Sequence, residues 1–324
     1  MLKISIIGAG QLGSRHLQAL AKTNLEVSIE VVEPDINAAE TAKQRFLEMG
    51  DNSKIKALSF FNSIDKLSTE LDLVIVATNS NVRYEVTKQL LSKKSVKNLV
   101  LEKVLFQEIS HYYDIENLLS ETKTECWVNH PRRMFPFYQQ LKKELTGIKQ
   151  ISFTFQGGNW GLACNGLHLL DIFSYLSGEN ILNINSDFLN KKIYKSKREN
   201  FIEFNGKLIG TIGQHFFSLF SIEYTTPTFL TISSDKLIAV IDETNGYARI
   251  VSEENGWKWE TIQNKIIYYQ SELTHTLIED ILINKVCNLP IYKEAMSLHI
   301  TFIQALMAFM EKVDGKQHKN CPIT

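Results

Sequence analysis

A glycine turn between two apolar runs constrains the fold of this chain more than any other feature. Leu2–Ile7 is typical of a buried parallel strand, and glycines at positions 8, 10 and 13 follow it in the pattern Gly-x-Gly-x-x-Gly. Residues 12–21 then carry a helical apolar pattern, and a β-rich run, Val27–Val32, ends at Glu33. A strand, a glycine turn, a helix and a second strand that ends in a carboxylate form the dinucleotide-binding pattern.

Each part of this pattern has a physical role. Gly8 permits the tight turn, Gly10 lets the backbone approach a pyrophosphate, and Gly13 allows close packing of helix on strand. The first N–H groups of the helix have no intrahelical partner and suit a bound diphosphate. Glu33 would accept hydrogen bonds from a ribose diol and repel a 2′-phosphate, so we expect NAD in preference to NADP. A glycine turn that binds nothing is the alternative.

Composition excludes several classes of protein. The chain has 324 residues, 44% hydrophobic and 22% charged, which is ordinary for two soluble globular domains. A net charge of −1 gives no electrostatic basis for binding nucleic acid or an anionic membrane. The start shows neither a basic leader nor a cleavage site, so we expect a cytoplasmic protein. The four cysteines form no Cys-x-x-Cys pair, and we expect no metal site.

Strands and helices alternate in the first part of the chain. Strands are expected at 56–60, 73–77, 99–101 and 125–128, with helices at 37–49, 84–91 and 109–120 between them. This alternation predicts an α/β fold, with a Rossmann domain of doubly wound parallel sheet over residues 1–128. Ligands bind beyond the carboxyl ends of such strands, although turns there can also be merely polar loops. We therefore add Gln11, Leu12, Thr78, Asn79 and Glu102 to the expected cofactor site.

The second part, residues 129–324, has a different pattern. Helices are expected at 137–145 and 167–176, where Gly178 is a C-cap, with a strand at 151–156. Residues 181–270 are rich in Ile, Phe, Thr and Tyr and contain several Asn-Gly turns. Helices at 273–287 and 293–313 follow, and the tail after Gly315 is expected to fray. We predict an α+β domain with a large open, mostly antiparallel sheet.

The order of these motifs resembles the Gfo/Idh/MocA oxidoreductases over nearly the whole chain. GAGQLGSRH at 8–16, ATN at 77–79, Glu102-Lys103 and GLHLLD at 166–171 occur in the family's order. The resemblance implies an NAD(P)-dependent dehydrogenase or reductase acting on CH–OH groups of a sugar, sugar acid, nucleotide-sugar or cyclitol. It also implies a homodimer or homotetramer that packs through the C-terminal sheet.

Three residues are the catalytic candidates. Lys103 follows a sheet strand, where its ammonium can donate to a substrate oxygen, although Val104 stands where the family's Glu-Lys-Pro motif has proline. His168 can accept a proton as hydride leaves the carbinol carbon, and Asp171, one helical turn on, can orient the imidazole. The alternatives are a solvated lysine and a histidine that is simply packed in the core.

One position departs from the family. Its dehydrogenases often carry an aspartate four residues before the histidine, and here that residue is Cys164, whose thiol supplies no fixed charge. Either Asn165 and Asp171 take over substrate orientation, or the chemistry is not simple alcohol oxidation. Arginines suit carboxylate or phosphate unless they pair with helix carboxylates. The expected substrate residues are Asn129, Arg132, Arg133, Asn159, Trp160, Cys164 and Asn165.

Two other functions stay open at this point. The chain can be a non-catalytic dinucleotide sensor or regulatory protein, with Cys164 marking a lost active site. It can also be a redox-neutral epimerase or lyase that oxidises and re-reduces its substrate on a captive NAD.

Overall fold

The computed structural model describes all 324 residues, which divide into two compact units. The first unit contains Met1–Phe106, Ser110–Pro131 and Tyr268–Tyr292, and the second contains Gln107–Ile109, Arg132–Ile267 and Lys293–Thr324. Residues 268–292 thus belong with the N-terminal unit, whereas a single boundary at 128/129 assigns them to the C-terminal part. None of the helices combines the length and the apolarity needed to cross a membrane.

The first unit is built on a six-stranded sheet in which every pairing is parallel. The strand order β3-β2-β1-β4-β5-β6 is that of a doubly wound Rossmann sheet, and it confirms the predicted fold class. The central strands are buried on both faces, which explains their continuous apolar runs. The strands are β1 (Leu2–Ile7), β2 (Val27–Val32), β3 (Ile55–Phe61), β4 (Glu70–Val76), β5 (Ser95–Glu102) and β6 (Glu125–Asn129).

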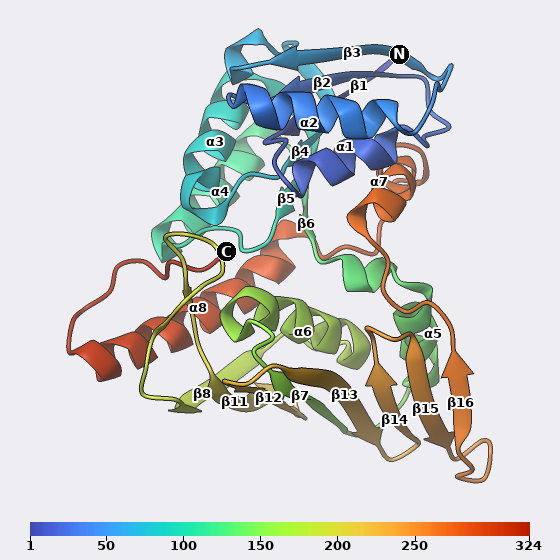
Figure 1. The fold of residues 1–324 in the computed structure, drawn as a ribbon, viewed down its shortest axis with the longest axis vertical. Helices are drawn as coiled ribbons and strands as arrows, with labels where there is room; N and C mark the ends of the chain where they lie inside the picture. The colour runs from blue at the N-terminus through green and yellow to red at the C-terminus, as the bar shows by residue number, and fades with distance from the viewer. The chain divides into compact units, whose positions relative to one another are not determined.

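Helices connect these strands, and one further helix of this unit, α7, comes from late in the chain. A 3-10 turn (Ile64–Lys66) lies before β4, and α7 packs beside α1 (Figure 1). Helix α7 is shorter than the predicted 273–287, because a π-helical turn, Asp280–Asn284, follows it. The helices are α1 (Gly13–Leu20), α2 (Ile36–Leu47), α3 (Ser80–Lys93), α4 (Ile109–Thr122) and α7 (Gln270–Glu279).

The second unit contains an eight-stranded sheet in the order β16-β15-β14-β13-β7-β12-β11-β8. All pairings are antiparallel except β12 with β7, so the predicted mostly antiparallel sheet is confirmed. Strands β9 (Tyr194–Lys195) and β10 (Ile202–Glu203) form a small separate ribbon. The sheet strands are β7 (Ile151–Gly158), β8 (Leu182–Leu189), β11 (Gly206–Ile212), β12 (His215–Ile222), β13 (Thr226–Ser234), β14 (Leu237–Asp242), β15 (Tyr247–Ser252) and β16 (Glu260–Gln263).

Three helices complete this unit after a 3-10 turn at Pro131–Met134. They are α5 (Pro136–Glu144), α6 (Leu162–Ser177) and α8 (Tyr292–Asp314). Helix α6 runs along one face of the sheet with α8 over it, and no helix covers the other face (Figure 1). Strand residues therefore alternate between a buried and an exposed side, as in β12.

The C-terminal tail is packed, so the expectation that it frays is wrong. Cys321 and Ile323 are fully buried. The N–H of Cys321 donates to the carbonyl of Gln107 at 2.9 Å, and the N–H of Ile202 donates to that of Pro322 at 2.9 Å. These partners are distant in sequence, and a short tail without periodicity gives no local sign of them.

Candidate functional site

The glycine turn has the geometry that a diphosphate requires. Gly8 has a φ of +86°, and a Cβ at Gly13 would overlap the carbonyl oxygen of Gly8, so both positions need glycine for the fold itself. A Cβ at Gly10 would meet no protein atom within 4 Å. No side chain caps α1, and its first turn holds no acidic residue. Open space beside uncapped N–H groups therefore forms a cradle for an anion.

A cavity of about 520 Å³ extends from this turn, a volume suited to a small ligand. Its lining includes Gly8, Gly10, Glu33, Thr78 and Asn79, so the structure gathers these five of the expected cofactor residues around one space. The Glu33 carboxylate lies at the turn, where it accepts from the N–H of Ala9 at 2.7 Å. These residues fit a dinucleotide whose ribose hydroxyls would donate to Glu33 in place of the Ala9 N–H group.

Gln11 and Leu12 lie at the start of α1 and do not line the cavity. The guanidinium of Arg45 donates to the Gln11 side chain at 3.1 Å and to the hydroxyl of Ser14. Sequence reasoning missed this arginine, which comes from the last turn of α2. It joins α2 to the first turn of α1.

Glu102 and Asn129 belong to a buried ring of side chains instead of lining the cavity. Glu102 accepts from His16 Nε2 at 2.9 Å and from the Asn129 amide. Asn129 also donates to Gln270 at 2.9 Å, and Gln270 donates to the Thr274 hydroxyl at 2.9 Å. His16 Nδ1 closes the ring on Thr274 at 2.9 Å. The ring joins α1, α7 and the ends of β5 and β6.

The Glu102 carboxylate is ionised in this ring. Burial acts to raise its pKa, but the bonds from His16 and Asn129 and the nearby charge of Arg83 outweigh burial and hold the pKa below its ordinary value. Sequence reasoning missed four residues of this site: His16 and Arg83, which act on the carboxylate directly, and Gln270 and Thr274, which bond Asn129 and His16. Only His16, within the glycine motif, carried a local signal.

Lys103 follows this anchored carboxylate directly and is half-buried. The peptide bond between Lys103 and Val104 is cis. The guanidinium of Arg83 donates to the carbonyls of Thr78, Val104 and Leu105, so it fastens the turn after β5 to the turn after β4. The backbone on both sides of Lys103 is therefore fixed by buried contacts.

In the second unit, α6 carries the other catalytic candidates. His168 is half-buried and Asp171 is buried. The Asp171 carboxylate receives Arg133 through Nε at 2.9 Å and Nη2 at 2.7 Å, and Arg133 also reaches Glu294 at 3.2 Å. Burial raises the pKa of the Asp171 carboxyl to about 6, and Arg133 opposes that rise. Asp171 is thus held by Arg133.

Arg132 is likewise held in a pair. Its Nε and Nη2 atoms donate to the two oxygens of Glu243 at 2.8 and 2.7 Å, and the Tyr138 hydroxyl donates to the same carboxylate. The two arginines expected in the substrate pocket therefore pair with carboxylates that lie 38 to 161 residues away along the chain. The sequence suggested pairing with a helix carboxylate as an alternative, but not these partners.

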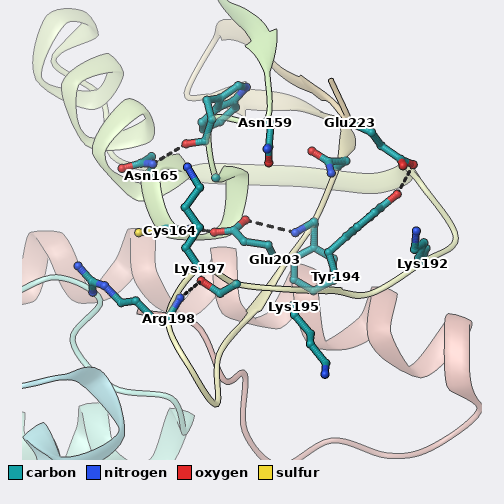
Figure 2. Close-up of a pocket in the computed structure, with 15 residues that line it drawn as sticks. Asn159, Cys164, Asn165, Lys192, Tyr194, Lys195, Lys197, Arg198, Glu203 and Glu223 are labelled. Atoms are coloured by element: carbon teal, nitrogen blue, oxygen red, sulfur yellow. Dashed lines mark hydrogen bonds between the residues drawn. The ribbon is translucent and has the colours of Figure 1, made fainter. Parts of the chain in front are cut away.

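The remaining substrate candidates line one cavity of about 450 Å³ at the start of α6 (Figure 2). Asn159, Trp160, Cys164 and Asn165 share it with a basic loop that sequence reasoning missed, residues 192–198. The Trp160 indole donates to the carbonyl of Phe220 at 2.9 Å, and the Asn165 amide donates to the carbonyl of Trp160 at 2.6 Å.

Glu203 supplies a negative charge at the turn where Cys164 stands in place of aspartate. Its carboxylate accepts from the N–H groups of Ala163 at 2.8 Å and Cys164 at 2.9 Å. This contact caps α6 and explains why the helix begins at Leu162, earlier than the apolar pattern at 167–176 indicates. No group of three or more His, Cys, Asp or Glu side chains is arranged to hold a metal ion.

Comparison with known families bears on the first unit. The model of the Gfo/Idh/MocA oxidoreductase family, NAD-binding Rossmann fold, matches residues 2–130. This segment is a Gfo/Idh/MocA NAD-binding domain. The match contains the glycine turn, Glu33 and the Glu102-Lys103 turn, so the resemblance inferred from these motifs is confirmed. Comparison with curated protein sequences found no match.

Solved structures are similar in fold over both units. An oxidoreductase from Agrobacterium radiobacter in complex with NAD⁺, L-tartaric acid and magnesium is 11% identical, with a TM-score of 0.71 and 97% of each chain covered. UDP-N-acetylglucosamine 3-dehydrogenase from Acidithiobacillus ferrooxidans is 14% identical (TM-score 0.69; 94% of this chain and 96% of that one covered). The transcriptional regulator Gal80p from Kluyveromyces lactis is 14% identical (0.70; 96% and 93%). At these identities the likeness shows the fold alone.

Proposed function

We propose that this protein is an NAD(H)-dependent oxidoreductase that transfers hydride between nicotinamide and a secondary alcohol or ketone carbon of a sugar-like substrate. The observation that carries the proposal is the open cradle at Gly10 beside the Glu33 carboxylate, in a domain of an NAD-binding oxidoreductase family. Similarity to a sugar-nucleotide dehydrogenase supports the substrate class.

The chemistry divides between cofactor and protein. NAD, when bound, supplies the hydride acceptor. Lys103 donates a hydrogen bond to the substrate oxygen and stabilises charge that develops on it. His168 takes the hydroxyl proton during oxidation and returns it during reduction. Glu102 fixes the backbone that carries Lys103, and Arg133 fixes Asp171 one helical turn from His168.

Absorbance with NADH and a panel of keto-sugars tests the proposal. Consumption of NADH by at least one substrate is expected. Binding of NADH without turnover of any substrate would contradict the proposal and favour a regulatory dinucleotide-binding protein, the second candidate, which the likeness to Gal80p favours. Product formation without net NADH consumption would instead identify a redox-neutral epimerase or lyase.

Cofactor preference should depend on Glu33. The substitution Glu33→Gln is expected to weaken NADH binding by about 10- to 100-fold, because a hydrogen bond to a charged group is lost. It should also reduce the preference for NADH over NADPH. Fluorescence titration of both cofactors measures this. Asp35→Asn is the matched control, because the Asp35 carboxylate caps α2 through the N–H groups of Asn37 and Ala38. Equal losses in both variants would contradict a ribose-binding role for Glu33.

We also propose that the uncovered face of the sheet packs against a second copy of the chain, giving a homodimer or a homotetramer. Three phenylalanines, Phe216, Phe220 and Phe229, share this face and are 53%, 37% and 40% exposed. An apolar face of this kind marks an interaction surface, and a two-fold axis pairs it with itself.

Light scattering after gel filtration tests this assembly. The double variant Phe216→Glu, Phe220→Glu is expected to become monomeric, because like charges would meet across the axis. Ile36→Glu is the control, since Ile36 is 83% exposed on α2, which belongs to the first unit and not to this sheet. A monomeric wild-type protein would contradict the proposal.

A further inference from the structure

The cavity at the start of α6 carries an excess of positive charge. Five of the eight residues from 191 to 198 are lysine or arginine. Four of these, Lys192, Lys195, Lys197 and Arg198, line the cavity together with two carboxylates, Glu203 and Glu223. Like charges in so short a segment repel one another, so the loop gains stability when an anion is bound among them.

Both carboxylates of the cavity are engaged with protein donors. Glu203 accepts from two backbone N–H groups of α6. Glu223 accepts from the Tyr194 hydroxyl and from the Asn190 amide at 3.2 Å. Neither carboxylate forms an ion pair with a cation of the loop, so the positive charges are not neutralised within the cavity.

Lys197 is the cation placed to meet a ligand. It extends across the cavity toward Cys164 and Asn165, whereas Lys195 points away (Figure 2). Lys197 makes neither a hydrogen bond nor an ion pair. Lys192 lies 4.6 Å from the centre of the Tyr194 ring, and Arg198 contacts the Thr324 hydroxyl at 3.5 Å. The cavity thus presents an ammonium beside amide groups, a combination suited to phosphate oxygens.

We propose that this cavity binds a phosphate group of the substrate, so that the substrate is a phosphorylated sugar-like molecule. The inference rests on the proposed oxidoreductase function and names its substrate class. A phosphate carries up to two negative charges and accepts from several donors at once, which matches the clustered cations. The volume of about 450 Å³ exceeds that of a single phosphate and leaves room for a sugar or a diphosphate. Sugar phosphates and sugar nucleotides share this chemistry.

Calorimetric titration with inorganic pyrophosphate tests the proposal. The protein is first saturated with NADH, which fills the glycine turn and removes that competing phosphate site. Wild-type protein is expected to bind pyrophosphate, and Lys197→Gln to weaken binding by about 10- to 100-fold, the loss of one charge-assisted hydrogen bond. Lys191→Gln, which removes the same charge from the same loop at a residue that does not line the cavity, is the matched control and should change binding by about twofold at most. Quenching of Trp160 fluorescence, absent in Trp160→Phe, places the ligand in this cavity.

Each result of these titrations either supports or overturns the proposed phosphate site. Absence of heat with pyrophosphate, or equal weakening by both lysine variants, would overturn the proposal. Titration of N-acetylglucosamine, its 1-phosphate and its uridine diphosphate derivative then separates the sources, and preference for the neutral sugar would also overturn it. NADH-dependent turnover of a neutral keto-sugar without pyrophosphate binding would refute the phosphate site and leave the oxidoreductase function intact. Pyrophosphate binding by a protein that does not bind NADH would support the phosphate site and contradict the oxidoreductase function.

Discussion

Replacing Lys103 with methionine is expected to lower kcat by about 10²- to 10⁴-fold while NADH affinity stays unchanged. Methionine keeps the length and apolar stem of lysine but removes the ammonium, so the developing charge on the substrate oxygen loses its donor. The backbone on both sides of Lys103 is fixed by buried contacts, so the substitution should leave the local fold in place. Steady-state kinetics and fluorescence titration of NADH separate the effect on turnover from any effect on cofactor binding.

Lys97→Met is the matched control for this experiment. Lys97 lies on the same strand, β5, but near its amino end, where it pairs with Asp72 at 2.8 Å on the surface. Removing an exposed pair of this kind costs about 1 kcal/mol of stability at most and should leave kcat unchanged. A Lys103→Met enzyme that turns over at the wild-type rate would exclude Lys103 from the reaction.

Alanine substitutions at two glycines of the same turn are expected to affect different properties, stability in one case and NADH binding in the other. Gly13→Ala should lower the free energy of unfolding by about 1–3 kcal/mol, because its Cβ overlaps the carbonyl oxygen of Gly8 and α1 must move. Gly10→Ala should leave the unfolding free energy unchanged, because its Cβ meets no protein atom. It should weaken NADH binding by at least about tenfold, because the methyl group occupies the cradle of the pyrophosphate.

Urea unfolding and NADH titration of the two variants measure these effects side by side. Wild-type NADH affinity in Gly10→Ala would show that the diphosphate does not rest on this turn, and would remove the main support for the proposed function. Unchanged stability in Gly13→Ala would show that α1 can shift away from the turn.

Sequence reasoning succeeded where the determining interactions are local. Apolar runs and the glycine spacing located the Rossmann sheet, the cavity residues Glu33 and Thr78, and the α6 helix that carries His168. These features depend on neighbours a few residues away, which a linear pattern records.

The remaining features depend on partners far away along the chain. Asn129 and Arg133 looked like ligand-binding residues, but their side chains meet Gln270 and Asp171, 141 and 38 residues away. Likewise, only the folded chain shows that Glu203 caps α6 and that the basic loop lines the same cavity. A polar residue at a strand end is equally suited to a ligand or to a distant side chain, and sequence alone does not decide between them.

The ring of His16, Glu102, Asn129, Gln270 and Thr274 has a consequence for biosynthesis. A ribosome delivers His16 and Glu102 long before Thr274, so the N-terminal sheet emerges with an ionised carboxylate in its interior and two of that ring's members still unmade. The buried hydrogen-bonded ring of the nascent domain is therefore complete only after residues from the last sixth of the polypeptide have been synthesised. Grafting residues 1–131 alone onto another protein would transplant an incomplete nucleotide-binding module.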